Sequence, residues 1–593
     1  MPGINCYISK ARLESKPSFA KDFLARQSEY YVNLHATECM LDEHVYLVTN
    51  SSASYKVAEM RFGDWIVFLE TQQPTVPEKE LGLLFRRIAI KELDTTAIRD
   101  WWSELPAILP DCFFLLAIHL TRKTVLFTND ELARLPVYIV DQGHSLFIGR
   151  DIGLAKASCP SVRLNPLYLA LYQVFCYVPG RGTYFDEIDT LPGASIGAFN
   201  WERGQLILVG KPELRFPEPD PSGSQRRRLA ELATRFETVI RGYKLHGNNV
   251  LALSGGFDSR VIAAAMTRRG VAYEAATYRD AARSADDDSR IADQIVSILK
   301  CPHQTFILNR ESEQNYKRLF HVKAGLNYLG MAFFLEFLDV LSQNYPEPMV
   351  LITGDGGDKV LPSQLPEIRL PDGSAWLDYL YAHQAYFSPQ VAAETFGIRK
   401  RALDDYLLEL ASSYPAKSFT YKYKQFLLAE RAGRWLFEGE DRNRAHFASV
   451  TPFYDMEFYR LALRIPDQWK QGNAFYSLFL RRIAPEISRI RLANSRVIPG
   501  YLSSGIYRSL LEILRMVRHF RTKPQAKPPG IPAFPMQDWM IGKIGSGCQD
   551  SGSMRNMFNC SRINDPSFLK GLDITQLRIM LTLGSVINEA MWD

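Results

Sequence analysis

Two glycine-rich segments carry the residues whose types and spacing could do chemistry. In the first, LALSGGFDSR at Leu251–Arg260, an apolar run leads into two glycines, two serines and an aspartate. Glycines let the backbone approach an anion closely, and a helix beginning there would direct unpaired amides at a phosphate group. Asp258 would repel that phosphate unless a divalent cation lay between them. The segment therefore predicts a phosphate-binding loop, and the absence of a following Gly-Lys-Ser/Thr excludes the Walker A type.

The second segment is TGDGGDKV at Thr353–Val360, which again follows an apolar run. Asp355 and Asp358 alternate with glycines at the end of a predicted strand, the edge at which open α/β sheets bind ligands. Together with Asp258, Asp358 could hold Mg²⁺, which favours carboxylate and phosphate oxygens. Taken alone, GDGGD is more typical of a polar turn. A position on the same sheet as the first segment would favour a site.

The elements around these segments predict a parallel sheet with helices on both faces. Helical patterns over 260–269 and 288–299 alternate with short apolar runs, and after about Trp376 the sequence is mostly helical. The predicted strands are Asn249–Leu253, Val271–Thr277, Gln304–Leu308 and Met349–Thr353.

The first 210 residues predict an antiparallel, sandwich-like unit. Short runs rich in β-branched and aromatic residues indicate strands at 65–69, 112–120, 124–128, 137–140 and 145–148. The segment Lys211–Arg228, with four prolines, a Ser-Gly-Ser and a closing arginine triplet, is the predicted linker. We therefore expect one domain over residues 1–215 and a second over 226–593.

Composition limits the classes of function. The chain has 593 residues, 46% hydrophobic and 23% charged, with a net charge of +5, which is too weak to indicate a nucleic-acid partner. Its eight cysteines form no CxxC pair, so neither a zinc site nor a disulfide framework is expected. No apolar run approaches the roughly 20 residues that span a bilayer, and the N-terminus lacks signal-peptide features. A cytoplasmic location is the expectation.

Near the C-terminus, Tyr507–Arg521 places Leu510, Leu514 and Val517 at helical spacing among several arginines. We expect a helix with this stripe facing the core, and a basic membrane or partner helix is the alternative. The proline-rich stretch Lys523–Pro535 predicts a surface loop.

The pair SGGFDS and GDGGDK resembles the synthetase domain of the class B asparagine synthetase family, whose phosphate loop reads SGGxDS and whose second motif reads about SGEGADE. Further segments similar to the family occur in the same order. They are LFTNDELARLPVYIV at Leu126–Val140, YFDEIDTLPGAS at Tyr184–Ser195, SADDDSRIADQIV at Ser284–Val296 and TPFYD at Thr451–Asp455. The resemblance implies an N-terminal-nucleophile glutaminase-like domain and an ATP-pyrophosphatase (PP-loop) domain. Such enzymes split ATP to AMP and pyrophosphate to activate a carboxylate for attack by an amine.

The sequence departs from the family's amidotransferases in two places. Those begin Met-Cys-Gly-Ile and use the exposed cysteine on glutamine, whereas this chain begins Met-Pro-Gly-Ile, and Cys6 lies out of register inside a predicted strand. The N-terminal domain is therefore expected to lack glutaminase activity. Asparagine synthetases also carry Glu-x-Arg before PFLD, where this chain has Ala448–Val450. That change implies a larger or less charged substrate than aspartate.

Relatives without the nucleophilic cysteine include β-lactam synthetases and lasso peptide cyclases, and the length and PFxD context favour a cyclase. The resemblance then implies adenylation of an Asp or Glu side chain of a leader-free peptide and ring closure by the peptide's N-terminal amine. Partners would be that precursor or core peptide and a leader peptidase of the same pathway. An ammonia-dependent asparagine synthetase, a β-lactam synthetase-like enzyme, a PP-loop tRNA-modifying enzyme and a non-enzymatic scaffold remain alternatives.

On this reading the triphosphate of ATP lies over the first glycine-rich loop, and its adenine lies near Thr277 and Tyr278. Mg²⁺ would be held by Asp258 and Asp358. Asp355 is the candidate base or metal support, and Lys359, Arg491 and Arg496 are candidate cations for the tetrahedral oxyanion. The residues predicted to contact ATP or pyrophosphate are Leu253, Ser254, Gly255, Gly256, Asp258, Ser259, Thr277, Gly354 and Gly356.

Overall fold

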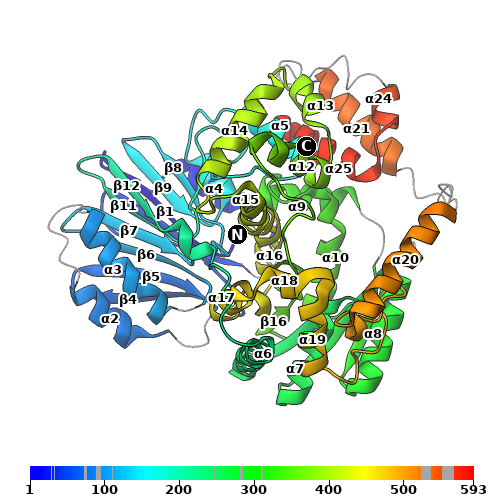
Figure 1. The fold of residues 1–593 in the computed structure, drawn as a ribbon. Coiled ribbons are helices and arrows are strands. Elements are labelled where there is room, and N and C mark those ends of the chain that lie inside the picture. Colours follow the sequence, from blue (N-terminus) through cyan, green and yellow to red (C-terminus); the bar gives the residue numbers. More distant parts are fainter. Residues whose placement is uncertain are drawn as a thin grey trace.

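The structure is a computed structural model that describes residues 1–27, 30–31, 34–72, 76–87, 95–109, 111–245, 247–280, 285–308, 312–521, 536–550 and 566–592. Antiparallel sheets occupy one side of the molecule, and a parallel sheet with many helices occupies the other (Figure 1). The predicted mixed α/β architecture, with an N-terminal antiparallel region and a C-terminal parallel sheet, is confirmed.

The N-terminal region contains two six-stranded antiparallel sheets. The first has the order β10-β8-β9-β1-β3-β2 and the second β12-β11-β7-β6-β5-β4. The strands of the first sheet are β1 (Gly3–Ser9), β2 (His35–Met40), β3 (Val45–Ser51), β8 (Tyr138–Asp141), β9 (Ser145–Gly149) and β10 (Asp189–Thr190). Those of the second are β4 (Val57–Phe62), β5 (Trp65–Thr71), β6 (Phe113–His119), β7 (Thr124–Asn129), β11 (Ser195–Asn200) and β12 (Gln205–Gly210).

The two sheets pack face to face because alternate residues of their strands are apolar. Ile4, Cys6 and Ile8 of β1 meet Phe114 and Leu116 of β6 in one buried cluster. The sequence analysis did not predict the helices of this region, because their apolar stripes are short. The helices α1 (Ser18–Gln27), α2 (Glu78–Arg87), α3 (Thr95–Ile108) and α4 (Ile152–Ala157) pack on the outer faces of the sheets, whereas α5 (Pro166–Phe175) packs against helices of the C-terminal region.

The predicted linker ends earlier than expected. After η1 (Pro212–Arg215), the chain enters α6 (Gln225–Gly242), which Ser224 caps by accepting a hydrogen bond from the Arg227 amide. The arginine triplet therefore belongs to the first turn of a helix. Arg228 pairs with Asp220, so the segment is held against the start of α6.

The parallel sheet has the order β15-β14-β13-β16-β17. Its strands are β13 (Asn248–Ala252), β14 (Glu274–Asp280), β15 (His303–Leu308), β16 (Met349–Ile352) and β17 (Ala448–Val450), and its first helices are α7 (Phe257–Arg269), α8 (Asp286–Leu299), α9 (Glu313–Lys323) and α10 (Phe333–Asn344). The second strand begins three residues later than the predicted Val271, after Gly270 ends α7 in the left-handed conformation (φ +59°). Within the mostly helical part after Trp376, the strand β17 was not predicted, because it is too short to show a strand period in the sequence.

Most of the remaining chain is helical, as predicted. The elements are α11 (Gly357–Val360), α12 (Gly373–Gln384), α13 (Pro389–Thr395), α14 (Lys400–Ser412), α15 (Phe419–Phe426), the π-helix η4 (Leu427–Leu436), α16 (Phe437–Arg444), α17 (Met456–Arg464), α18 (Asp467–Lys470), α19 (Ala474–Ile483), α20 (Gly505–Arg521), α21 (Met536–Asp550), α24 (Pro566–Lys570) and α25 (Ile574–Ile587). Short 3-10 helices η2 (Tyr243–Leu245), η3 (Leu329–Met331), η5 (Pro452–Tyr454), η6 (Gln471–Asn473), η7 (Pro499–Tyr501) and η8 (Glu589–Trp592) join them.

The prediction that the apolar stripe of α20 faces the core is wrong at the position where the structure describes the side chain, Leu510. Leu510 is 51% exposed and its neighbour on the same face, Ile513, is 52% exposed, because α20 runs away from the body of the molecule (Figure 1). The side chains of Leu514 and Val517, and the predicted loop Lys523–Pro535, lie outside the described residues. Within the described part of the chain, no helix has the length and apolar character needed to cross a membrane.

Candidate active site

Both glycine-rich segments emerge at the same edge of the parallel sheet. β13 and β16 are hydrogen-bonded neighbours, with Leu251 opposite Ile352. The turn after each strand therefore lies beside the other, as the carboxyl ends of neighbouring parallel strands must. This adjacency makes the second segment part of a site rather than an isolated polar turn.

The first loop is held in shape by its own hydroxyls and by a buried arginine. The Ser254 amide donates to Ser259 Oγ at 3.0 Å, and the two hydroxyl oxygens are 3.1 Å apart. Arg260 Nε and Nη2 donate to the Gly256 and Gly255 carbonyls at 2.7 and 2.8 Å. Burial lowers the pKa of Arg260 to about 10. The loop is thereby preorganised at the N-terminus of α7, where an anion is favoured.

Gly255 is required by close packing. A Cβ there would lie 2.5 Å from the Cβ of Ala493. Ala493 is held at this distance because its backbone amide donates to the Gly255 carbonyl at 3.2 Å. The Gly255 amide itself donates to Asp288 Oδ1 at 3.0 Å. One backbone amide of the loop is therefore already hydrogen-bonded to a carboxylate.

The second turn needs a glycine for a different reason. Gly356 has φ +96° and lies against the ring of Tyr454, a combination that a residue with a side chain would strain. Its conformation starts α11, so that Asp358 lies next to Asp258 and its backbone amide bonds the Asp258 carboxylate. Lys359 pairs with Asp358 at the exposed side.

The carboxylates brought together here repel one another. Burial and the charge of Asp358 raise the pKa of Asp258 to about 7, although Tyr476 donates a hydrogen bond to it. The residues present fit Mg²⁺, because a divalent cation between Asp258 and Asp358 would remove this repulsion. No group of three or more His, Cys, Asp or Glu side chains arranged for a metal occurs among the described residues. Phosphate oxygens would therefore supply the other ligands.

A fourth carboxylate, Glu440 of α16, was missed by the sequence analysis. It is buried, and its oxygens accept hydrogen bonds of 2.6 Å from the hydroxyls of Thr353 and Ser449. Burial and the neighbouring Glu440 raise the pKa of Asp355 well above its usual range. The two form a buried carboxyl pair. No sequence motif marked Glu440, which reads as one charge in the polar run EGEDRNR.

The candidate cations differ in their placement. Arg491 forms a two-pronged ion pair with Asp287, with Nη2–Oδ1 and Nη1–Oδ2 distances of 2.5 and 2.8 Å, so its guanidinium is already engaged. Arg496 is exposed and has no ion pair within the described residues. Lys359, through its pair with Asp358, is the candidate that the structure brings to the carboxylates.

The predicted adenine contact is only partly available. Thr277 is buried and its hydroxyl donates to the Leu253 carbonyl at 2.9 Å, while His303 Nε2 lies 3.0 Å away. The Thr277 side chain therefore links β13, β14 and β15. Tyr278 packs its ring against Phe333 and Phe337.

A cavity of about 170 Å³ reaches Glu440 from the side of the N-terminal sheets. Its wall includes Gln72 and Arg134 of the N-terminal region, and Arg444 and Thr451 from the elements around β17. Thr451 donates to the Asp355 carbonyl, so the cavity lies directly behind the carboxyl pair.

Residues 249–488 match the model of a protein family described as asparagine synthase. The matched segment contains both glycine-rich turns, Glu440 and Thr451–Asp455, and it ends before Arg491 and Arg496. The match supports the resemblance to the asparagine synthetase-like family. No curated protein has a sequence that matches this chain.

Two solved structures share a distant likeness with this chain. NMN synthetase from Francisella tularensis is 15% identical over 36% of this chain and 95% of that one, with a TM-score of 0.20. Glutamine phosphoribosylpyrophosphate amidotransferase from B. subtilis, complexed with ADP and GMP, is 7% identical over 61% of this chain and 83% of that one, with a TM-score of 0.23. Scores this low carry no argument about function.

Proposed function

We propose that the chain is an ATP-dependent, AMP-forming amide ligase that closes a macrolactam in a leader-free peptide. The observation that carries the proposal is the buried carboxyl pair of Asp355 and Glu440 beside the Asp258–Asp358 pair, at the edge where the phosphate loop begins α7. One pair suits the pyrophosphate of ATP with its metal, and the other suits proton transfer. A ligase that adenylates a carboxylate needs both.

The first half-reaction forms an acyl-adenylate. An oxygen of the substrate carboxylate attacks the α-phosphorus of ATP, and the bond from that phosphorus to the bridging oxygen breaks to release pyrophosphate. The amides and hydroxyls of Ser254–Ser259 bind the leaving phosphates. Mg²⁺, when bound by Asp258 and Asp358, supplies positive charge that offsets the leaving group's charge.

The second half-reaction forms the amide. The peptide's amine attacks the acyl carbon, the acyl–phosphate oxygen bond breaks, and AMP leaves. A proton must be removed from the attacking nitrogen, and Asp355, whose pKa is raised by burial and by Glu440, is the proposed acceptor. Lys359 is the proposed cation for the oxyanion.

The narrower substrate class rests on Ala448–Val450. This segment forms the edge strand β17, and its Ser449 hydroxyl bonds Glu440. The Glu-x-Arg of asparagine synthetases would put two charges in these positions. Small uncharged residues leave room for a larger, less charged group, such as an Asp or Glu side chain carried by a peptide.

The proposal is tested by ATP–pyrophosphate exchange and AMP release with three additions: a leader-free core peptide, aspartate with ammonia, or no substrate. We expect peptide-dependent AMP release and a product lighter by one water. The variant Asp258→Asn should abolish both signals, and Asp405→Asn, an exposed aspartate of α14 paired only with Arg401, should leave them unchanged.

Each other outcome has a definite reading. AMP formation with aspartate and ammonia would replace the proposal by asparagine synthesis. Absence of AMP with every substrate, and identical behaviour of Asp258→Asn, would exclude an AMP-forming ligase altogether.

A further inference from the structure

A second cavity of about 430 Å³ lies away from the carboxylates, between the N-terminal sheets and the C-terminal helices. Three parts of the chain form its wall: the turns around Leu132 and Leu191, the linker at Arg215 and Phe216, and the helices α14 and η4. Its volume falls within the roughly 300–1,000 Å³ range of small-molecule sites. Most of the lining is apolar, with a few polar groups at defined positions.

Arg215 is the arginine of this wall with the weakest polar contacts, and its guanidinium lies 5.5 Å from the centre of the Phe216 ring. Its Nη2 makes one long hydrogen bond, 3.4 Å, to the Ala429 carbonyl, and its Nε is buried without any hydrogen-bond partner. Within the described residues, no carboxylate forms an ion pair with it. A buried N–H without a partner costs free energy that a bound acceptor would recover.

Glu430, Arg434 and Arg181 of the wall already have polar partners, and Arg181 pairs with Asp189. Glu430 accepts from the Gly180 amide at 2.7 Å and from the Tyr414 hydroxyl at 2.8 Å. Arg434 donates to Thr190 Oγ1 at 2.7 Å and to the Gly182 carbonyl at 2.8 Å. The wall thus holds three arginines, Arg181, Arg215 and Arg434, against two glutamates, Glu409 and Glu430. The excess charge is positive, and the available donor is Arg215.

The backbone of this wall is itself unusual. Residues 427–436 form a π-helix, a rare conformation that occurs often at functional sites. Within it, Gly433 faces the cavity with nothing closer to a Cβ position than Arg215 Nη2 at 3.8 Å. A residue with a side chain would fit the backbone there and fill the cavity. Glycine keeps the space open in front of the guanidinium.

We propose that this cavity binds an apolar group that ends in a carboxylate, with the carboxylate on Arg215 and the apolar body against Leu132, Leu191 and Phe216. The C-terminal residue of a peptide and a free aryl or alkyl acid share this chemistry. The site does not depend on amide ligation, since none of its lining residues belongs to the carboxylates that would handle ATP.

The test uses the full chain and three probes: N-acetyl-L-phenylalanine, its primary amide and phenethylamine. Binding is measured by isothermal titration calorimetry or by saturation-transfer NMR. We expect the acid to bind about tenfold or more tighter than the amide, a difference typical of a charge-assisted pair, and the amine to bind weakest. The variant Arg215→Gln should reduce the acid's affinity to that of the amide.

Gly433 locates the site without disturbing the fold. The variant Gly433→Leu should abolish binding of the acid, while Gly433→Ala, which adds one methyl group, should retain most of it. A comparison with 3-phenylpropionate identifies the source: a preference for the acetylated amino acid indicates a peptide end, and equal binding indicates a free acid.

The proposal is overturned if the acid and amide bind equally, or if Gly433→Leu leaves the acid's affinity unchanged. ATP–pyrophosphate exchange plays no part in this measurement. A failure here is therefore separate from a failure of the proposed ligase.

Discussion

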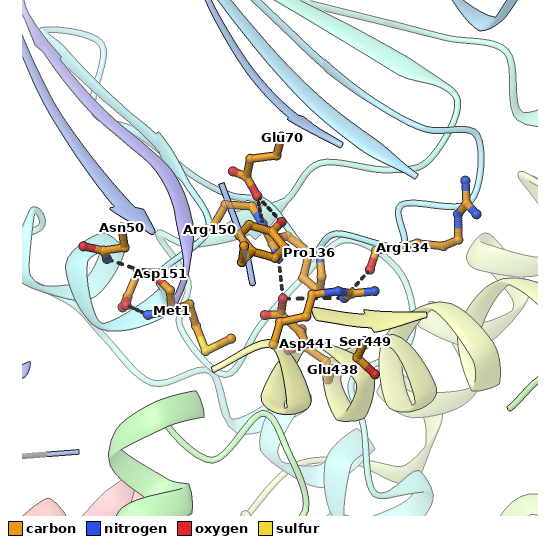
Figure 2. Close-up of polar contacts among 12 residues, drawn as sticks. Met1, Asn50, Glu70, Arg134, Pro136, Arg150, Asp151, Glu438, Asp441 and Ser449 are labelled. Atoms are coloured by element: carbon orange, nitrogen blue, oxygen red, sulfur yellow. Dashed lines mark hydrogen bonds and ion pairs between the residues drawn. The ribbon is translucent and has the colours of Figure 1, made fainter. Parts of the chain in front are cut away.

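The protein contains two clusters of charged side chains that differ in how their charges are balanced. The ion-pair network, formed by Glu70, Arg150, Lys323, Glu438, Asp441 and Arg444, links the N-terminal sheets to α9 and α16. Figure 2 shows Glu70, Arg150, Glu438 and Asp441 of this network. The carboxylate cluster, formed by Asp258, Asp355, Asp358 and Glu440, lies at the edge of the parallel sheet. The first joins acids to bases, whereas in the second four carboxylates face two cations, Lys359 beside Asp358 and the buried Arg442 near Glu440 and Asp355.

The ion-pair network satisfies its charges internally. Arg150 Nε lies 3.1 Å from Glu70 Oε2, and its Nη2 pairs with Asp441. Lys323 Nζ lies 2.7 Å from Asp441 Oδ2 and 2.6 Å from Glu438 Oε2. Burial opposes the charged forms, yet the opposite charges lower the pKa of Asp441 and raise that of Lys323. Glu70 is the exception, because burial outweighs Arg150 and raises its pKa.

In the carboxylate cluster, burial and neighbouring charges act in the same direction. The pKa of Asp258 rises to about 7 and that of Asp355 rises well above its usual range, because burial and another carboxylate act on each. The comparison teaches that a buried charge cluster is structural when it is closed by opposite charges. A cluster of like charges needs a cation or a proton from outside, which is the property of a functional site.

The largest expected effect separates the two clusters by activity. The variant Asp355→Asn should lower peptide-dependent AMP release by about 10²–10⁴-fold, the usual contribution of a general base, with little loss of stability. The free energy of unfolding of this variant is expected to be equal to or higher than that of the unmodified protein, because a repelling charge is removed. Rates are measured with saturating ATP, and the urea midpoint is measured alongside. Loss of the fold together with activity would place Asp355 with the structural charges.

The second prediction breaks the ion-pair network. Arg150→Met leaves Glu70 buried without its cation, while Asp441 keeps Lys323, and should lower the free energy of unfolding by about 3–5 kcal/mol. The exposed Arg163→Met, whose side chain is 73% accessible, should change it far less. Urea unfolding followed by fluorescence provides both values.

A double variant sharpens that result. If paired charges are the reason for the loss, Arg150→Met with Glu70→Gln should recover part of it, because one unpaired carboxylate is then gone. A double variant that is less stable than the single one would show that Arg150 acts through packing instead.

The third prediction adds the missing cation to the carboxylate cluster. Mg²⁺ with pyrophosphate should stabilise the protein by about 2–3 kcal/mol at a hundredfold excess over its dissociation constant. Asp258→Asn should lose this stabilisation, while Arg150→Met should keep it from a lower starting point. Thermal unfolding with and without the ligands measures the shift. An equal shift in Asp258→Asn would remove Asp258 from the proposed metal site.

The smallest effect concerns a buried cation beside another cation. Lys470 donates to the Val360 carbonyl at 2.8 Å, and burial and Lys424 lower its pKa to about 7. The folded state therefore binds fewer protons than the unfolded state between pH 7 and about 10.5. Below pH 7 the buried Lys470 is charged, and this lowers the free energy of unfolding by the full amount. The loss becomes smaller as the pH rises from 7 to about 10.5.

The variant Lys470→Met should accordingly stabilise the protein by about 1–2 kcal/mol at pH 6, and by less at pH 9. Urea midpoints at the two pH values give the comparison. A gain that grows with pH would mean that Lys470 is charged and stabilised in the folded protein.

The sequence by itself determined the two glycine-rich turns and the sheet that carries them. Ser254–Ser259 and Thr353–Val360 are continuous segments, and their strands and helices follow from local periodicity over about ten residues. The antiparallel N-terminal strands were predictable for the same reason. The helices that cover them, α2 and α3, were not predicted, because the apolar positions that bury them have meaning only against a particular sheet.

Tertiary structure decided which charges meet. Glu440 reaches Asp355 and Thr353 across more than 80 residues, and Arg150 meets Asp441 across 291. β17 exists because β16 offers it a hydrogen-bonding edge, and the cavity at Arg215 exists because three distant segments fail to fill the space between them. Such contacts depend on the desolvation and Coulomb energy of groups that only the folded chain brings within a few ångströms of each other. No local pattern in the sequence encodes that energy.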